Sequence, residues 1–181
     1  MLNNKGTKVI ETERLILRPF KKDDGKDMFE NWANDDRVTK YLRWNTHENV
    51  NESYEICSMW EEESKKINNY QWAIVCKETN KVIGSIGLVD LNEKMLCGEV
   101  GYAIGYNYWG KGIVKEALLE LIKYFKEIGL VRLQAYHEVE NINSGKVLIK
   151  SGFEYEGTLR KSVLNKRDEL VDAKIYSIII N

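Results

Sequence analysis

The chain has 181 residues, of which 27 are basic and 28 acidic, giving a net charge of −1. This balance provides no overall drive toward nucleic acid or toward anionic membranes, so neither is an expected partner. Hydrophobic residues make up 43% of the chain, enough for one packed domain over residues 1–181, and no apolar run reaches the roughly 20 residues of a membrane helix. The three cysteines are far apart and lack metal-ligand spacing, which predicts reduced thiols in a cytoplasmic protein that holds no metal. The protein is expected to be a monomer or a homodimer.

The first half of the chain predicts a strand, two helices and a β-hairpin, at residues 9–19, 23–34, 46–67, 70–76 and 82–89. Apolar and polar residues alternate in the strand before Pro19 ends it. Asp23 or Asp24 is a suitable N-cap for the first helix, and Thr46 for the second.

The second half predicts a strand ending at residue 104, then further elements at residues 113–128, 132–139, 143–150, 153–163 and 170–180. The helix that follows Gly112 has an apolar stripe and stops at Gly129. This order predicts a mixed, mostly antiparallel α/β sheet of about seven strands flanked by helices. The unit from Glu99 to Val139 is the one expected parallel crossover.

A glycine-rich turn, Asn107-Tyr108-Trp109-Gly110-Lys111-Gly112, joins that strand to its helix. Glycines let backbone N–H groups approach an anion, and a helix N-terminus adds unpaired donors and a positive dipole end. The turn therefore predicts a phosphate-bearing ligand, although a tight turn alone also uses glycine. The run from Gly105 to Gly110-Lys111 mimics a nucleotide-binding P-loop, but Gly112 stands where Ser or Thr would hold magnesium.

Glu99 is the candidate general base. Strand alternation puts Glu99, Gly101 and Ala103 on one face, so the carboxylate lies beside two small residues and can face an open cleft. The alternative is a surface carboxylate paired with a lysine. Farther along, Asn141 can offer its amide to a ligand, while Asn143 or Ser144 can cap the short helix. His47 and His137 have no evident partner and are interpreted as structural.

The chain resembles the GNAT superfamily of acyl-coenzyme A-dependent N-acetyltransferases, in the branch of the ribosomal-protein N-terminal acetyltransferases. Two of the motifs are Tyr108-Trp109-Gly110-Lys111-Gly112 and Asn141-Ile142-Asn143-Ser144. The segments that match, in order and spacing, are residues 13–20, 72–74, 82–88, 98–102, 108–112, 141–144, 147–148, 150–157, 159–160, 172 and 176–177.

The resemblance implies a GNAT fold and acetyl-coenzyme A (acetyl-CoA) as the donor. It implies cofactor contacts at Tyr102, Ala103, Ile104, Asn107, Trp109, Gly110, Lys111, Gly112, Ile113, Asn141 and Ser144. The glycine turn would hold the pyrophosphate through backbone N–H groups, and the strand end would pair with the pantetheine arm. Asn107 departs from the family's Gln or Arg, and Leu148 replaces a common tyrosine acid, which leaves Ser144 or water to protonate the leaving thiolate.

The resemblance also implies that the acceptor is an amine, which Glu99 would help to deprotonate. At pH 7 an α-amine is roughly 15% neutral and a lysine under ~0.1%, so a weakly placed base favours an α-amine such as a protein N-terminus. Tyr41 and Trp44 are candidate acceptor contacts. Polyamines, amino sugars and antibiotics remain alternatives, as do a non-catalytic acyl-CoA sensor and a nucleotide-binding module.

Overall fold

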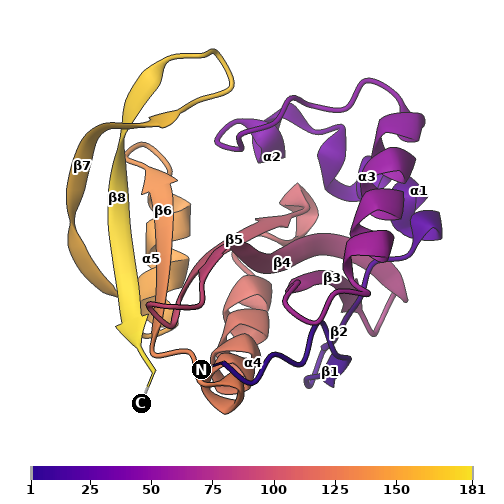
Figure 1. Cartoon of the computed structure of the whole chain (residues 1–181). Helices are drawn as coiled ribbons and strands as arrows, with labels where there is room; N and C mark the ends of the chain where they lie inside the picture. Colours follow the sequence, from indigo (N-terminus) through magenta and orange to yellow (C-terminus); the bar gives the residue numbers. More distant parts are fainter. Residues whose placement is uncertain (1, 181) are drawn as a thin grey trace.

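The structure is a computed structural model that describes residues 2–180. Its strands form one sheet in the order β1-β2-β3-β4-β5-β6-β8-β7 (Figure 1). They are β1 (Ile10–Glu11), β2 (Leu15–Arg18), β3 (Gln71–Cys76), β4 (Lys81–Asn92), β5 (Cys97–Ile104), β6 (Arg132–Glu138), β7 (Glu154–Leu164) and β8 (Leu170–Ile179). The helices are α1 (Gly25–Met28), α2 (Asp36–Thr39), α3 (Val50–Glu63), α4 (Ile113–Ile128) and α5 (Ile142–Lys150). The prediction of a mixed, mostly antiparallel sheet is confirmed.

The sheet has eight strands rather than seven because the first predicted strand is a hairpin. The Thr12 backbone N–H donates to the Leu15 carbonyl at 3.0 Å, and its side-chain oxygen accepts from the Leu15 N–H at 2.9 Å. These bonds close a turn at residues 12–14, so β1 pairs back onto β2. Alternation alone does not distinguish one long strand from two short ones joined by a turn.

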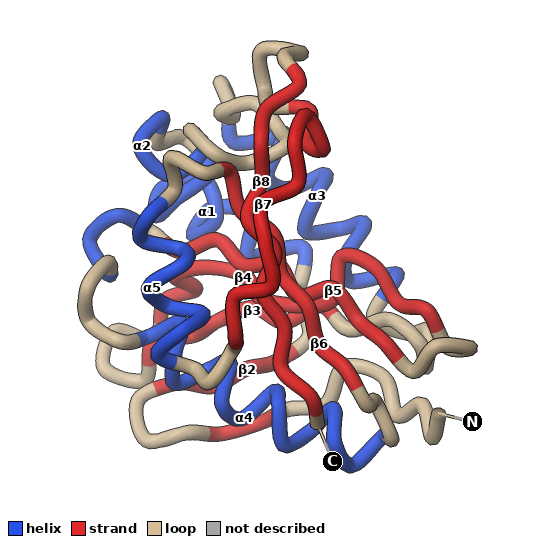
Figure 2. Tube along the Cα trace, turned by 90° about the vertical axis from the view of Figure 1, so that its left-hand side faces the viewer, coloured by secondary structure: helices blue, strands red, loops and turns tan. Residues whose placement is uncertain are grey.

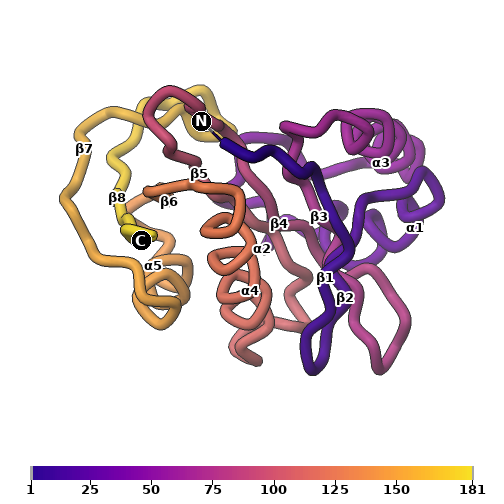
Figure 3. The backbone as a smooth tube through the Cα atoms, turned by 60° about the horizontal axis from the view of Figure 1, so that its bottom comes forward, coloured from indigo at the N-terminus to yellow at the C-terminus, as the bar shows by residue number. Residues whose placement is uncertain are grey.

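Both faces of the central sheet are buried. In β3, Trp72 and Ile74 belong to the core formed with α4, whereas Ala73 and Val75 belong to a second core with Met28 of α1. Figure 3 displays α4 and α5 on one side of the sheet and α1 and α3 on the other. Strands buried on both sides read as continuous apolar runs, which explains the composition of β3.

The parallel pair β5 and β6 is short and then opens. Its registered pairs are Cys97 with Arg132, Gly98 with Leu133 and Glu99 with Gln134, and the two strands then diverge (Figure 1). On its other edge β5 stays paired with β4 up to Ile104. The sheet therefore splits beyond Glu99, and one edge of β5 is left without a neighbouring strand.

The segment before β3 departs most from prediction. The first helix is broken into a 3₁₀ turn (Lys22–Asp24), α1 and a π-helical turn (Phe29–Ala33). A Cβ at Gly25 would lie 2.5 Å from the Tyr54 ring, so α3 crosses α1 at close contact there. The second helix starts at Val50, capped by Asn49 and not by Thr46, which instead hydrogen-bonds Asp36 of the unpredicted α2.

Strands β7 and β8 form a long hairpin that rises past α5 (Figure 2). Its turn reaches α2, where the Lys166 ammonium lies 3.6 Å from the Asp36 carboxylate and 3.5 Å from the Thr39 hydroxyl. The hairpin and α2 thus meet across the side of the molecule where β5 and β6 diverge. No helix in residues 2–180 combines the length and apolar character needed to cross a membrane.

Candidate active site

The glycine turn has the backbone of an anion-binding loop. Gly110 and Gly112 have φ values of +73° and +74°, in the left-handed region that favours glycine. Gly112 is also the N-cap of α4, a position with no side-chain cap. Within the described residues, none of the backbone N–H groups from Gly110 to Ile113 donates a hydrogen bond. These free donors at a helix N-terminus fit a phosphate, as predicted from the sequence.

The strand end leading into this loop has one free edge. Ala103 and Ile104 are buried; the register with β4 turns the Ala103 backbone toward Ser85, so the Ile104 backbone faces the free edge. The Trp109 indole N–H donates to the Ile104 carbonyl at 2.9 Å, and the Trp109 ring remains 38% exposed beside the glycines. Ile113, whose side chain is buried in the α4 core, likewise offers only its backbone.

Tyr102 and Ser144 meet across the opening between β5 and α5. Their hydroxyl oxygens are 2.8 Å apart, and burial raises the pKa of Tyr102 to about 12 despite that hydrogen bond. Asn141, not Asn143 or Ser144, is the N-cap of α5, and its side-chain oxygen accepts from the Ser144 N–H at 3.3 Å. The capping role expected at residue 143 or 144 therefore belongs to Asn141, which leaves the Ser144 hydroxyl to face Tyr102.

Glu99 is the last residue of β5 paired with β6, and its side chain is 17% exposed. It shares a face with Ala103, opposite to Val100, which packs into the α4 core. Burial raises the pKa of this carboxyl and Asp90 raises it further, while Arg43 lowers it, for a net upward shift. The Arg43 guanidinium lies 3.4 Å from the carboxylate and is itself 64% exposed. The predicted face of Glu99 is confirmed, and its cation is an arginine rather than a lysine.

The segment between α2 and α3 carries the predicted acceptor residues. Trp44 is partly buried against the α1–α3 core, with its ring centroid 5.2 Å from that of His47. Tyr41 is half-buried and has the Lys40 ammonium 4.8 Å from its ring centre. The same segment supplies Arg43 to Glu99. The structure thus brings this segment to the candidate base, although acceptor contact by Tyr41 and Trp44 stays a prediction.

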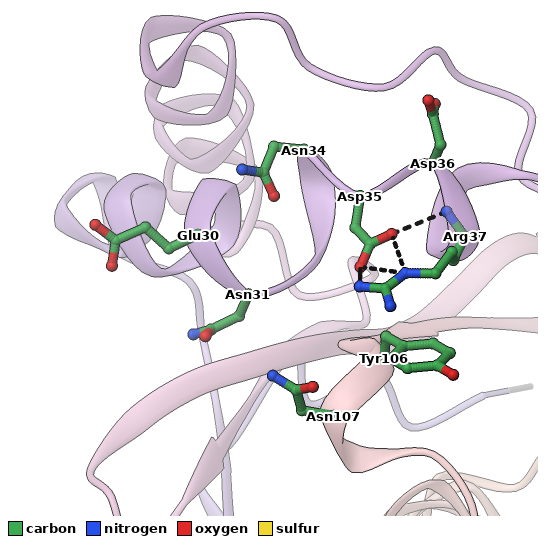
Figure 4. A pocket seen from close by; sticks show the side chains of 8 residues that line it. All are labelled: Glu30, Asn31, Asn34, Asp35, Asp36, Arg37, Tyr106 and Asn107. Carbon is green, nitrogen blue, oxygen red and sulfur yellow. Dashed lines mark hydrogen bonds and ion pairs between the residues drawn. The ribbon is translucent and has the colours of Figure 1, made fainter.

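Asn107 lines a polar cavity of about 380 Å³ next to the glycine turn (Figure 4). The cavity lies against α2, where Arg37 is held by Asp35 and its guanidinium carbon sits 3.9 Å from the Tyr106 ring centre. Tyr106 in turn contacts the Trp109 ring, at a centroid distance of 5.0 Å. The Asn107 side chain is therefore grouped with α2 residues, and its contact with a cofactor stays a prediction.

Both histidines make contacts that are typical of structural residues. His47 Nδ1 lies 2.7 Å from the Ser53 hydroxyl. His137 stacks on Tyr176, and its Nδ1 lies 2.7 Å from the Glu138 carbonyl. No group of three or more His, Cys, Asp or Glu side chains suited to a metal ion occurs in the part of the chain that the structure describes.

Two side chains at the candidate site were not predicted from the sequence. Arg43 comes from an irregular segment 56 residues before Glu99, so no periodicity connects the two. The other is the Tyr102 hydroxyl, because Tyr102 was expected to contact the cofactor only through its backbone. Its strand alternation with Val100 did place it on the α4 and α5 face, which was a usable signal.

Comparison with known proteins decides the family. The sequence profile described as "Acetyltransferase (GNAT) domain" matches residues 14–154. The chain belongs to the GNAT acetyltransferase family. It is therefore an N-acetyltransferase that uses acetyl-CoA, and the free N–H groups of the glycine turn and the free edge of β5 fit that cofactor.

Similar proteins agree with this assignment. An uncharacterized N-acetyltransferase, p20 from Bacillus licheniformis, is 33% identical over 169 residues, covering 93% of this chain and 94% of p20. The ribosomal-protein-serine acetyltransferase of Escherichia coli is 31% identical over 104 residues, covering 56% of this chain and 57% of that protein. The crystal structure of ribosomal-protein-S5-alanine acetyltransferase from Vibrio fischeri superimposes with a TM-score of 0.81 at 25% identity, covering 96% and 97% of the two chains.

Proposed function

We propose that this acetyltransferase transfers the acetyl group to an α-amine, of the kind found at a protein or peptide N-terminus, with Glu99 as general base. The observation that carries the proposal is the position of Glu99 at the point where β5 and β6 part. The Glu99 side chain lies on the face of the residue 40–49 segment, at the opening of the sheet beyond which lies the α4 and α5 face with the glycine turn. Donor and acceptor then approach from opposite faces and meet beside Glu99.

Glu99 is suited to receive the proton of an acceptor ammonium. Its carboxylate already holds one cation, Arg43, on its open side. An incoming acceptor ammonium ion replaces Arg43 at the Glu99 carboxylate, because both cations bind the same oxygen atoms. The raised pKa of Glu99 brings it closer to that of an α-amine, which eases proton transfer directly or through water.

The leaving sulfur needs a proton, and Tyr102 and Ser144 supply a hydroxyl pair for it. The neutral acceptor nitrogen forms its bond to the acetyl carbon and loses its second proton to water, the carbon–sulfur bond breaks, and the sulfur takes a proton from the Ser144 hydroxyl. The Ser144 oxygen regains a proton from the Tyr102 hydroxyl 2.8 Å away, water returns a proton to Tyr102, and the Tyr102 pKa of about 12 keeps that phenol protonated at neutral pH. An unpaired N–H of β5 near Tyr102 and Ala103 stabilises the negative charge that develops on the acetyl oxygen.

The acceptor class rests on the strength of the base and on relatives. A single carboxylate, whose pKa is raised by burial and only partly lowered by Arg43, suits an α-amine, whose ordinary pKa is about 7.8, better than a lysine, whose pKa is about 10.4. Relatives named for acetylating ribosomal proteins, including the serine enzyme of Escherichia coli, support a protein acceptor. The alternative acceptor is a small-molecule amine such as a polyamine, an amino sugar or an antibiotic.

An acceptor panel tests the proposal. The purified chain is incubated with labelled acetyl-CoA and equal concentrations of peptides with free N-termini, N-blocked lysine peptides, spermidine and an aminoglycoside. We expect label on the peptide α-amines, and preferential labelling of a small-molecule amine would contradict the acceptor assignment. Calorimetric titration with acetyl-CoA serves as the control that the donor binds.

A further inference from the structure

We infer that Arg14, clamped by Glu116, is a positioning residue that orients the Lys111–Gly112 peptide for the cofactor pyrophosphate. This inference rests on the proposed use of the glycine turn. It assigns a role to the β1–β2 turn, a segment distant in sequence from the loop. The residues involved are Thr12 and Arg14 in that turn, Lys111 and Gly112 in the loop, and Glu116 in the first turn of α4.

Glu116 fixes the Arg14 side chain. Its carboxylate accepts from the Arg14 backbone N–H at 2.9 Å and from Arg14 Nε at 2.7 Å, and it also accepts from the Thr12 hydroxyl. Burial alone would raise the pKa of Glu116, but these hydrogen bonds lower it below its usual value. The carboxylate is thus ionised and occupied at neutral pH, and it holds the guanidinium in one orientation.

The fixed guanidinium reaches the glycine turn. Arg14 Nη1 donates to the Lys111 carbonyl at 3.0 Å. Arg14 Nη2 is the nearest atom to a Cβ built on Gly112, at 3.8 Å. One face of the Lys111–Gly112 peptide is therefore anchored to the β1–β2 turn.

Peptide geometry turns this anchor into an orientation for the next donor. In a trans peptide the C=O of one residue and the N–H of the next point in opposite directions. Because the Lys111 carbonyl points at Arg14, the Gly112 N–H points away from Arg14, and it makes no hydrogen bond within residues 2–180. Without the anchor, this peptide could flip about ψ of Lys111 and φ of Gly112, because glycine accepts either sign of φ, and a flipped peptide would present a carbonyl oxygen to the phosphate.

The test compares binding of three ligands to wild-type protein, Arg14→Ala and Arg14→Lys by calorimetry. The ligands are coenzyme A, 3′-dephospho-coenzyme A and pantetheine. Pantetheine lacks the phosphates, and its binding is measured by competition with coenzyme A. We expect Arg14→Ala to weaken binding of coenzyme A and of 3′-dephospho-coenzyme A by the same factor, about tenfold, and to leave pantetheine unchanged. Arg14→Lys keeps the charge but cannot hold Glu116 and Lys111 together, so a similar loss is expected.

Lys77→Ala is the matched control. The Lys77 ammonium donates to the Thr12 carbonyl at 2.7 Å. Lys77→Ala therefore removes one positive charge from the β1–β2 turn, as Arg14→Ala does, but leaves the contacts of the glycine turn unchanged. We expect unchanged coenzyme A affinity in Lys77→Ala, with thermal unfolding used to confirm that every variant is folded. If Arg14→Ala does not fold, the Arg14→Lys comparison decides.

Three results would overturn the inference. Unchanged coenzyme A affinity in the Arg14 variants, beside an active wild type, would remove only the role of Arg14. An affinity loss that shrinks at high salt would identify a direct charge contact instead of an orienting one. Wild-type protein that binds no coenzyme A would remove the proposed function itself.

Discussion

At the scale of single residues, the proposed transfer depends on the protonation states of two groups. Glu99 must be deprotonated to act as a base, and burial together with Asp90 raises its pKa while Arg43 lowers it. Tyr102, with a pKa of about 12, must stay protonated to support Ser144. The proposed proton acceptor and the proposed proton donor thus lie on opposite faces of β5.

Arg43→Ala is expected to shift the pH dependence of kcat/KM. Removing Arg43 takes away a cation that favours the charged carboxylate, so the pKa of Glu99 rises. Activity falls as the pH drops through that pKa, and the acidic limb of the profile therefore moves to higher pH. Arg43→Lys, which keeps a cation, should leave the limb close to its wild-type position. An acidic limb that does not move in Arg43→Ala would show that Glu99 is not the group whose titration produces that limb.

Ser144→Ala is expected to lower kcat with little change in affinity for acetyl-CoA. General acid catalysis contributes about 10²- to 10⁴-fold, but Tyr102 or water can partly replace the lost hydroxyl, so about 10²-fold is expected. Tyr102→Phe, which leaves Ser144 in place, should have a smaller effect. Steady-state kinetics and calorimetry check both variants, and equal kcat in wild type and Ser144→Ala would assign the proton to water.

At the scale of secondary structure elements, the two ends of α4 have different roles despite similar glycines. Gly112 at its start and Gly129 at its end have φ values of +74° and +91°. A Cβ at either position would meet its nearest neighbour at 3.8 Å or 3.9 Å, which is ordinary contact. The two positions differ in surroundings, since only Gly112 lies in the glycine turn.

Gly112→Ala and Gly129→Ala are expected to lower the free energy of unfolding by similar amounts, about 1–2 kcal/mol, because alanine is strained in the left-handed region. Only Gly112→Ala should also weaken coenzyme A binding, since it alters the peptide that presents an N–H to phosphate. Chemical denaturation and calorimetry measure the two quantities. Equal coenzyme A affinity in both variants would argue against a phosphate at this turn.

The sequence predicts those elements whose pattern is local. Alternation in β5 and the stripe of α4 give their positions correctly, and the glycines mark the loop between them. The helix predicted at residues 23–34 is instead a 3₁₀ turn, α1 and a π-helical turn, and α1 packs at Gly25 against Tyr54 of a different helix, a contact that local pattern does not show. Thr46 is a suitable cap by type, yet Asp36 and Thr39 engage it, and Asn49 with Glu52 forms the capping box. Such choices are made by tertiary contacts that a single sequence does not reveal.

At the scale of the whole molecule, α5 is supported by a buried histidine. His137 Nε2 is buried without a hydrogen-bond partner, and a Cβ at Gly145 would lie 2.7 Å from it. Burial lowers the pKa of His137, and Lys174 lowers it further, although the Glu138 carbonyl opposes the shift. A proton on this ring would place a buried charge under the first turn of α5.

Stability is expected to fall on mild acidification because of His137. Its pKa is lower in the folded chain than in the unfolded chain, where it is about 6.5. Below about pH 6.5 the unfolded state binds a proton that the folded state does not, so stability decreases as the pH falls toward the folded pKa. Urea unfolding between pH 7.5 and 5 should show a steeper loss in wild type than in His137→Gln. Parallel curves for the two proteins would exclude His137 as the cause.

The central claim is that acetyl transfer takes place beside Glu99, where β5 and β6 part. The most direct measurement is single-turnover acetyl transfer to a peptide α-amine by wild type and Glu99→Gln, with acetyl-CoA affinity measured in parallel. We predict equal acetyl-CoA affinity and a transfer step about 10²- to 10⁴-fold slower in Glu99→Gln. Equal transfer rates in the two proteins would contradict the claim.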